Sequence, residues 1–347
     1  MNNSVDNTSD LPEQAPSSMD TPYAALGPDV VLDAVESLGY LSDMRIYPLN
    51  SYENRVYQVG IEGGEPLIAK FYRPHRWSDE QIEEEHQFSQ QLADLDIPVV
   101  PPMQLDGRTL FQYQARENYA YRFALYIRKG GQAPELDNDD NLYTLGKHIG
   151  RIHNLGKEFL FTHRPELNIE TFGTASREFL LAQNFVPASL RESYGTLTQH
   201  LLERCEALFG RIEYQPIRLH GDCHPGNILW RNDAPNFVDL DDARNGPAAQ
   251  DLWMLLSGER ERRTQQLSNL IDGYEEFCDF NRAELSLFEG LRTLRLMHYA
   301  AWLARRWQDP AFPQAFPWFN TERYWAEHIL ELREQMSALE EPALRVM

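Results

Sequence analysis

"HGDCHPGN", at residues 220–227, brings two imidazoles, a carboxylate, a thiol and an amide together within one short stretch. Pro225 and Gly226 exclude a regular helix between them, so the stretch is predicted to be a loop. Such a loop could bind a metal, pair a nucleophile with its base, or position one carboxylate and one amide for another reaction. The segments on either side of the loop decide among these three interpretations.

A metal site would use His220, Asp222 and His224, which alternate and therefore project to one side of an extended segment. Structural zinc sites need four ligands, usually with paired cysteines. Metallophosphoesterases need further motifs, Gly-Asp-x-x-Asp and Gly-Asn-His, and neither is present. A thiol nucleophile is also disfavoured, because Cys223 and its neighbour His224 point opposite ways, and Cys223 is expected to be a small buried residue.

Phosphoryl transfer fits the spacing better. Asp222 and Asn227 lie on one loop, and the apolar segment "NFVDL" then delivers Asp239, with Asp241 and Asp242 just beyond as second-ranked candidates. Transfer of a γ-phosphoryl group needs a carboxylate that orients the attacking hydroxyl and accepts its proton. It also needs hard oxygen ligands for Mg²⁺, which Asn and Asp supply.

The same reaction needs a cation on the α- and β-phosphates, and that cation must come from elsewhere in the chain. Lys70, in "IAKFY", is the lysine that lies in the middle of a predicted strand. The helix after it carries Glu83, Glu84 and Glu85, one of which could pair with Lys70 while the others form a solvated face. Walker and G-x-G-x-x-G motifs are absent, so P-loop and Rossmann sites are not supported.

Around these motifs the chain divides into a strand-rich part and a mostly helical part. The polar residues 1–25 are expected to form a disordered tail. In the first part we expect helices at 28–40 and 78–96, strands at 55–61 and 66–72, and three short strands within 98–127. After a linker, "RKGGQAP", we expect helices at 137–156, 187–210, 259–280 and 282–308, with short extended runs near 218–219, 228–230 and 237–240.

The composition limits the classes of function. The 347 residues are 42% hydrophobic, which is typical of a globular protein. Their net charge of −21 would repel nucleic-acid phosphates and anionic lipids. Three separated cysteines indicate a reducing compartment without a disulfide framework. There is no signal-peptide pattern and no apolar run that could span a membrane. We therefore expect a cytoplasmic protein with neither nucleic-acid nor membrane partners. A monomer is the expected state, although the composition does not determine it.

Lys70 in a strand, a Glu on the next helix, "HGDCHPGN" and "VDLDD", in that order, resemble the kinase-like phosphotransferases, which include aminoglycoside, choline and homoserine kinases. Longer stretches resemble the bacterial stress response kinase A family, of the YihE/RdoA type, over nearly everything after residue 26. These stretches include "RLHGDCHPGNILWR", "FVDLDDARNGPAAQDLWMLL" and "AWLARRWQDPAFP". The resemblance implies an α+β, bilobal, protein-kinase-like fold, with a nucleotide-binding lobe at 26–127 and a catalytic and substrate lobe at 128–347.

The resemblance also implies roles for individual residues. Asp222 matches the catalytic base, and Asn227 and Asp239 match the Mg²⁺ ligands, with Asp239 counted as catalytic as well. Lys70 matches the lysine on the α- and β-phosphates of ATP, and Glu85 is the best match to its ion-pair partner.

The segment "NSYENR" takes the place of the glycine-rich loop of that family, and Ser51 matches a residue near the ATP phosphates. A tight turn there would present backbone N–H groups and a hydroxyl to phosphate oxygens, although by itself it predicts only an ordinary hairpin. His220 is expected to hold the catalytic loop together, and Asp251 to be a structural carboxylate beneath it.

The function expected is an ATP- and Mg²⁺-dependent kinase of hydroxyl groups, and the resemblance implies a protein Ser/Thr acceptor in the bacterial stress response. Too few residues separate Asp239 from Asp251 for the activation segment of eukaryotic protein kinases. A small alcohol or amino alcohol therefore remains an alternative acceptor. A nucleotide-binding regulator without turnover is a third hypothesis, which the complete set Lys70, Asp222, Asn227 and Asp239 disfavours.

Overall fold

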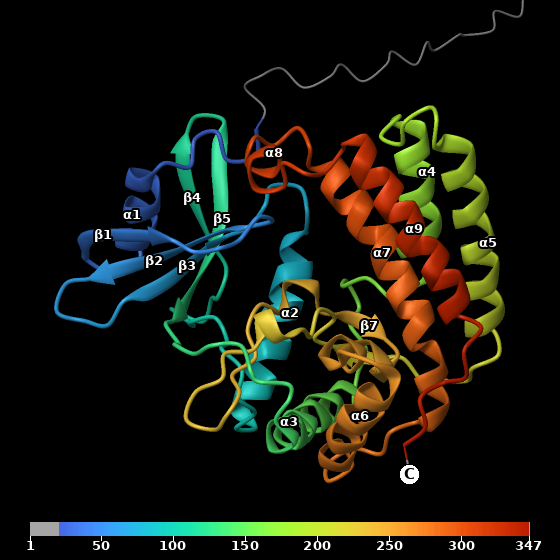
Figure 1. Ribbon diagram of the computed structural model, residues 1–347. Helices are drawn as coiled ribbons and strands as arrows, with labels where there is room; N and C mark the ends of the chain where they lie inside the picture. Colours follow the sequence, from blue (N-terminus) through green and yellow to red (C-terminus); the bar gives the residue numbers. More distant parts are fainter. Residues whose placement is uncertain (1–20, 347) are drawn as a thin grey trace, which may run out of the picture.

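The computed structural model describes residues 21–346, in which a curled antiparallel sheet lies beside a larger helical part (Figure 1). The small sheet part and the large helical part confirm the expected α+β, two-lobed arrangement. The strands pair in the order β1-β2-β3-β5-β4. The elements of the sheet part are α1 (Pro28–Glu36), β1 (Ser42–Pro48), β2 (Arg55–Ile61), β3 (Leu67–Phe71), α2 (Asp79–Asp94), β4 (Phe111–Arg116) and β5 (Tyr119–Ile127).

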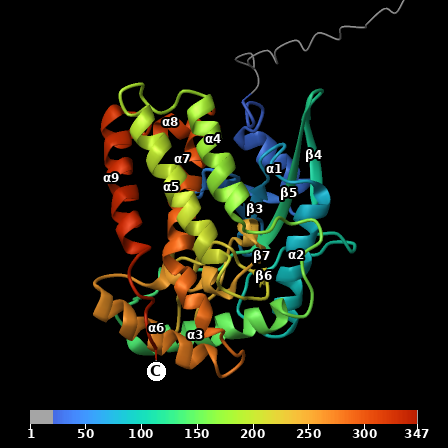
Figure 2. The same ribbon diagram turned by 90° about the vertical axis from the view of Figure 1, so that its right-hand side faces the viewer.

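In the helical part, α4, α5, α7 and α9 pack side by side, as Figure 2 shows, while α3 packs against α6. The helices are α3 (Asp139–Gly156), α4 (Ala175–Ala182), α5 (Arg191–Phe209), α6 (Arg260–Tyr274), α7 (Phe288–Arg305), α8 (Ala311–Ala315) and α9 (Glu322–Ala338). Two short strands, β6 (Ile217–Leu219) and β7 (Arg244–Gly246), pair with each other. Within 21–346, none of the helices combines the length and the apolar character that a membrane crossing requires.

The alternation of side chains along β3 positions a lysine for the site. Leu67, Ala69 and Phe71 are buried in the core that the sheet shares with α1. Ile68 and Lys70 must then face the opposite side of the sheet, because successive side chains of a strand alternate. Both residues line a cavity there, between the sheet and the helical part.

Helix α2 joins the two parts of the molecule and lies between them in Figure 1. Its start is fixed by a capping box, in which the Ser78 hydroxyl accepts from the Gln81 N–H and the Gln81 side chain accepts from the Ser78 N–H. Ile82 packs with residues of the sheet part, whereas Phe88 and Leu92 are fully buried in the core of the helical part. The helix therefore ties the position of the sheet to that of the second core.

Three glycines allow α3 and α6 to approach each other closely. A methyl group on Gly146 would overlap the carbonyl oxygen of Leu270, and one on Gly273 would overlap that of Tyr143. A methyl group on Gly150 would likewise overlap the carbonyl oxygen of Tyr274. Because the two helices meet backbone to backbone, larger residues at these positions would force them apart.

The structure bears out much of the expected order of elements, but it also contains three helices that were not expected, α4, α8 and α9, and it corrects further elements. Residues 98–110 form isolated bridges instead of the third strand expected within 98–127, since Pro98, Pro101 and Pro102 offer no N–H donors. An additional strand, β1, pairs with β2 at the sheet edge, and an irregular register hides its alternation. The helix expected at 282–308 opens as a 3₁₀ helix, and its α-helical portion is α7.

The tail expected at 1–25 lies mostly outside the described residues, which begin at residue 21. Residues 21–25 do not extend away from the protein. The Tyr23 hydroxyl donates to the carbonyl oxygen of Glu53, and the Ala25 N–H donates to the hydroxyl of Tyr121. The packed structure thus begins before the expected boundary, because an aromatic ring and a small side chain fit against the sheet.

We predict that Gly146→Ala lowers the free energy of unfolding by about 1–3 kcal/mol, because the new methyl group overlaps the backbone of α6. Urea denaturation measures the change. The control is Gly195→Ala in α5, where the nearest atom to the new methyl group would lie 3.9 Å away. That variant should be neutral or gain up to about 1 kcal/mol from helix propensity. Equal stability of both variants would contradict the close packing of α3 against α6.

Candidate active site

The loop at 220–227 is held from below by Asp251. The two carboxylate oxygens of Asp251 accept the backbone N–H groups of His220 at 2.8 Å and Gly221 at 2.9 Å. A buried imidazole, that of His153, lies 3.0 Å from the same carboxylate. Gly221 has φ +84°, and a side chain on it would overlap the carbonyl oxygen of Asp242. The expected structural role of Asp251 is confirmed.

His220 connects this loop to the segment that carries Asp239. Its Nε2 lies 3.0 Å from the carbonyl oxygen of Val238, and its Nδ1 lies 3.4 Å from the backbone nitrogen of Asp222. A proton on Nε2 satisfies both contacts, because the carbonyl oxygen accepts and the backbone N–H donates. The side chain is buried within the loop, as expected, and is not free to bind a metal together with Asp222 and His224.

Asp222 lies at the centre of a group of polar side chains. Its Oδ1 is 2.6 Å from a guanidinium nitrogen of Arg295, and its Oδ2 is 3.4 Å from both His224 Nε2 and Asn227 Nδ2. Burial opposes the charge on Asp222, but the hydrogen bond from His224 and the positive charge of Arg295 lower its pKa below the usual range. The carboxylate is therefore ionised at neutral pH.

Asp239 faces Lys70 across the space between the two parts. Its Oδ1 is 2.8 Å from the Lys70 ammonium, which also lies 3.3 Å from Asp241. Asp239 has φ 59°, in the left-handed region that few residues other than Gly, Asn and Asp adopt. Burial alone would lower the pKa of Lys70, but Asp239 and Asp241 raise it well above its usual value. The lysine is thus a permanent cation.

Glu85 is buried on the first turns of α2, yet the ion pair expected between it and Lys70 is not formed. Lys70 pairs with Asp239 and Asp241 instead, because these two carboxylates lie closer to its ammonium. Burial raises the pKa of Glu85 to about 7, and the positive charge of Lys70 offsets this only in part. One carboxyl oxygen of Glu85 has no hydrogen-bond partner.

A cavity of about 340 Å³ brings five of the six predicted site residues together. They are Ser51, Lys70, Glu85, Asn227 and Asp239. Asp222, the sixth, is connected to the cavity through Asn227, whose Nδ2 also donates to the Asp222 carbonyl oxygen at 3.0 Å. The Ser51 hydroxyl closes its own turn by donating to the carbonyl oxygen of Asn54.

The donor set in the cavity suits a magnesium nucleotide. Asn227 uses its Nδ2 as a donor, which leaves its Oδ1 without a hydrogen-bond partner among residues 21–346. The Asp239 side chain is 50% exposed beside it, so an amide and a carboxylate oxygen are both accessible to a cation. Mg²⁺ is commonly held by one or two such protein oxygens together with phosphate oxygens.

A buried ion network near the site escaped the sequence analysis. Arg76 pairs with Asp241 and with Asp242, and Arg244 pairs with Asp242 at 2.7 Å. Arg76 and Lys70 offset the burial of Asp241 and bring its pKa to about 2. Asp241 and Asp242, which ranked second as metal or substrate ligands, are therefore engaged in ion pairs.

Further contacts join the turn at 50–55 to the helical part. Glu53 pairs with Arg306 and accepts a hydrogen bond from the Trp302 indole nitrogen at 2.6 Å. Asp309 pairs with Arg73 at 3.0 Å. Local sequence patterns do not predict ion pairs between residues so far apart along the chain. The charged stretch "ARRWQDP" is the one feature of the sequence that points to them.

Comparison with known proteins places the chain in a family. Residues 45–288 match the model of the phosphotransferase enzyme family. The chain is 44% identical over 324 residues to "Stress response kinase A" of Escherichia coli (strain K12), covering 93% of this chain and 97% of that protein. It is 43% identical over the same length to "Serine/threonine protein kinase RdoA" of Salmonella typhimurium (strain LT2), with the same coverage.

Solved structures share the fold at lower identity. The amicoumacin kinase hAmiN, in complex with AMP-PNP, Ca²⁺ and Ami, matches with a TM-score of 0.72 and 18% identity over 91% of this chain and 95% of that one. A microcompartment-associated aminopropanol kinase matches with a TM-score of 0.62 and 19% identity over 91% of this chain and 99% of that one. These likenesses confirm the kinase-like, two-lobed fold.

We predict that Glu85 makes the free energy of unfolding decrease as pH rises. Between the ordinary pKa of 4.5 and the folded value of about 7, the folded protein holds a proton that the unfolded chain has released. The free energy of unfolding should then decrease by up to about 3 kcal/mol as pH rises through this window. Glu85→Gln keeps a neutral side chain and should remove this part of the decrease.

Urea denaturation at several values between pH 5 and pH 8 measures the effect. Glu83→Gln, on the exposed face of the same helix, is the control and should keep the pH dependence of the unmodified protein. The same slope in Glu85→Gln and in the unmodified protein would show that Glu85 is not protonated in the folded state.

Proposed function

The chain belongs to the phosphotransferase enzyme family and, within it, to the stress response kinase A group, and we propose that this kinase uses ATP and Mg²⁺ to phosphorylate Ser and Thr hydroxyls of proteins. The observation that carries the proposal is the convergence of Lys70, Asn227 and Asp239 on one cavity, with Asp222 next to it. A cation, two oxygen ligands and a carboxylate base are the groups that γ-phosphoryl transfer requires.

In this proposal Asp222 orients the acceptor hydroxyl and accepts its proton as the new bond to phosphorus forms. Asn227 holds Asp222 through its Nδ2 and offers its Oδ1 to the metal, together with the carboxylate of Asp239. Bound Mg²⁺ would supply charge neutralisation on the β- and γ-phosphates. Lys70 would contact the α- and β-phosphates, because its ammonium lies beside Asp239 in the cavity.

The remaining wall of the cavity is suited to the adenine ring. Apolar side chains from both lobes line it, and they include Val56, Ile68, Val100, Leu229 and Val238. Tyr126 and Ile127, at the end of β5, lie where the two lobes join, which supports contact between adenine and this backbone. Ser51 lies on the turn that would cover the phosphates. The proposal sets the lobe boundary at 127/128 and has the protein act as a cytoplasmic monomer.

A protein acceptor is supported by the relative of Salmonella typhimurium that is named a serine/threonine protein kinase, of which this chain covers 97%. A small alcohol or amino alcohol is the second candidate. The segment between Asp239 and Asp251 favours it, because this segment is a buried run of 3₁₀ turns with β7 and offers no platform for a peptide. Fold neighbours at low identity include an aminopropanol kinase and a choline/ethanolamine kinase family protein.

We predict that Asp222→Asn lowers phosphate transfer by about 10²–10⁴-fold while ATP still binds, because the proton acceptor is lost and the nucleotide contacts remain. Transfer from γ-labelled ATP is measured to Ser- and Thr-containing proteins and, in parallel, to a panel of small amino alcohols. Binding of a fluorescent ATP analogue and the melting temperature report on folding and nucleotide affinity.

EDTA should abolish transfer in the unmodified protein, and added Mg²⁺ should restore it. Label in proteins but not in amino alcohols supports the first candidate, and the reverse supports the second. Undiminished transfer in Asp222→Asn, or no labelled acceptor of either kind, would refute the proposed mechanism.

A further inference from the structure

Both carboxylate oxygens of Asp222 face protein groups, although buried Oδ1 receives no hydrogen bond from any residue of 21–346. Oδ2 faces His224 and Asn227, each at 3.4 Å. Oδ1 faces the guanidinium of Arg295 at the much shorter distance of 2.6 Å. An acceptor hydroxyl must donate its hydrogen bond to one of these oxygens before it can react. The shorter contact means that Arg295 occupies a position that a hydroxyl or a water molecule would otherwise take.

Arg295 is not fixed in this position by other partners. Asp222 is its only ion-pair partner within 4 Å among residues 21–346. Its side chain is 36% exposed, so the guanidinium can move without breaking a buried network. Arg292, one turn earlier on α7, differs in this respect, because it pairs with Glu289 at 3.0 Å and covers the ring of Trp253. Because only its contact with Asp222 holds the Arg295 guanidinium, the guanidinium can move when that contact is broken.

We propose that Arg295 is a gate on Asp222, which keeps water from the base until an acceptor hydroxyl displaces the guanidinium. The inference rests on the proposed role of Asp222. In the closed state the guanidinium occupies Oδ1, and in the open state the acceptor hydroxyl donates to Oδ1 instead. Water alone gains too little from one hydrogen bond to displace a charged partner, whereas an acceptor held by further contacts can do so.

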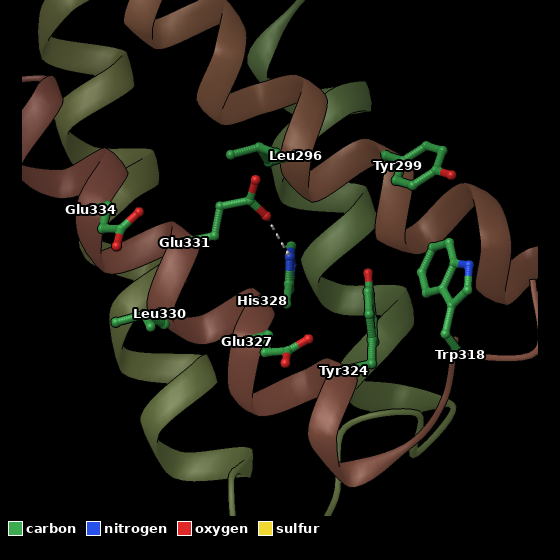
Figure 3. Close-up of a pocket in the computed structure, with 9 residues that line it drawn as sticks. All are labelled: Leu296, Tyr299, Trp318, Tyr324, Glu327, His328, Leu330, Glu331 and Glu334. Carbon is green, nitrogen blue, oxygen red and sulfur yellow. Dashed lines mark ion pairs between the residues drawn. The ribbon is translucent and has the colours of Figure 1, made fainter. Parts of the chain in front are cut away.

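An acidic pocket begins one turn along α7 from Arg295. A pocket of about 580 Å³ lies between α7 and α9, and Figure 3 shows Leu296 and Tyr299 on its α7 side. Tyr299 lies four residues after Arg295 on α7, so the two side chains are neighbours on one face of the helix. The carboxylates of α9 that line the pocket are Glu327, Glu331 and Glu334. Negative charge there lowers the cost of moving a guanidinium away from Asp222.

The reaction that the gate suppresses is the hydrolysis of ATP. A water oxygen would form a bond to the γ-phosphorus while the bond from phosphorus to the β–γ bridging oxygen breaks. The water proton passes to Asp222 and then to solvent, and the products are ADP, inorganic phosphate and a proton. Removing Arg295 opens Oδ1 to water, so this reaction should accelerate even though an enzyme side chain has been lost.

The experiment uses the full chain with Mg²⁺ and ATP, with and without an acceptor identified in the preceding screen. Arg295→Gln should hydrolyse ATP without acceptor at least about tenfold faster than the unmodified protein. The number of acceptor molecules phosphorylated per ADP formed should fall, and KM for the acceptor should decrease. Arg295→Lys, which keeps the charge, should hydrolyse ATP as slowly as the unmodified protein.

Two further variants make the result specific. Arg292→Gln is the matched control on the same helix and should leave hydrolysis and coupling unchanged. Asp222→Asn combined with Arg295→Gln should lose the additional hydrolysis, because the water is activated through Asp222. ATP-analogue binding and melting temperatures exclude simple unfolding.

Unchanged or slower hydrolysis in Arg295→Gln, with normal ATP binding, would overturn the gate. A persistent increase in the double variant would also overturn it, since the effect would not pass through Asp222. If the unmodified protein shows neither transfer nor hydrolysis, the proposed function itself fails. If it shows transfer but Arg295→Gln hydrolyses no faster, the gate alone fails.

Discussion

The ammonium of Lys70, held between the carboxylates of Asp239 and Asp241, is the interaction on which the architecture of the site depends. The lysine comes from the sheet lobe and both acids come from the helical lobe, so the contact fixes the distance between the lobes. The side chain of Lys70 is only 8% exposed, and a buried charge that lost its partners would be costly. Asp241 is held in turn by Arg76. The cavity keeps its form because these charges satisfy one another.

The sequence predicted elements whose determinants are local. β2 has the expected limits, and α2 begins after its Ser78 cap, because alternation and capping act within a few residues. Lys70 was expected in the middle of a strand, and the alternation along β3 directs it toward the cavity. Local patterns failed where pairing depends on distant residues. The prolines at 98–102 look like the boundaries of a strand, but they lack the backbone N–H groups that a strand needs for pairing. Strand β1 is defined by its pairing with β2 more than by its own residues.

In the site, too, contacts within one loop could be predicted, whereas contacts between distant segments had no local signal. Asn227 and Asp222 share a loop, and their contact follows from their spacing. Asp239 meets Lys70 across 169 positions of sequence, and their convergence was expected from the requirements of phosphoryl transfer and from the family resemblance, not from a local pattern. The resemblance also implied that Lys70 pairs with Glu85, yet the lysine pairs with Asp239 and Asp241. The contact of Arg295 with Asp222 had no signal at all, because one arginine among many on a helix gives no sign of its partner.

The central claim is that one cavity holds a metal nucleotide between a lysine of the sheet lobe and an amide and a carboxylate of the helical lobe. Crystals grown with Mn²⁺ and a non-hydrolysable ATP analogue test it most directly, because anomalous scattering locates the metal without reference to the fold. The account predicts an anomalous peak within ligand distance of Asn227 Oδ1 and the Asp239 carboxylate, with Lys70 on the phosphates. A metal bound elsewhere, or a nucleotide outside this cavity, would contradict it.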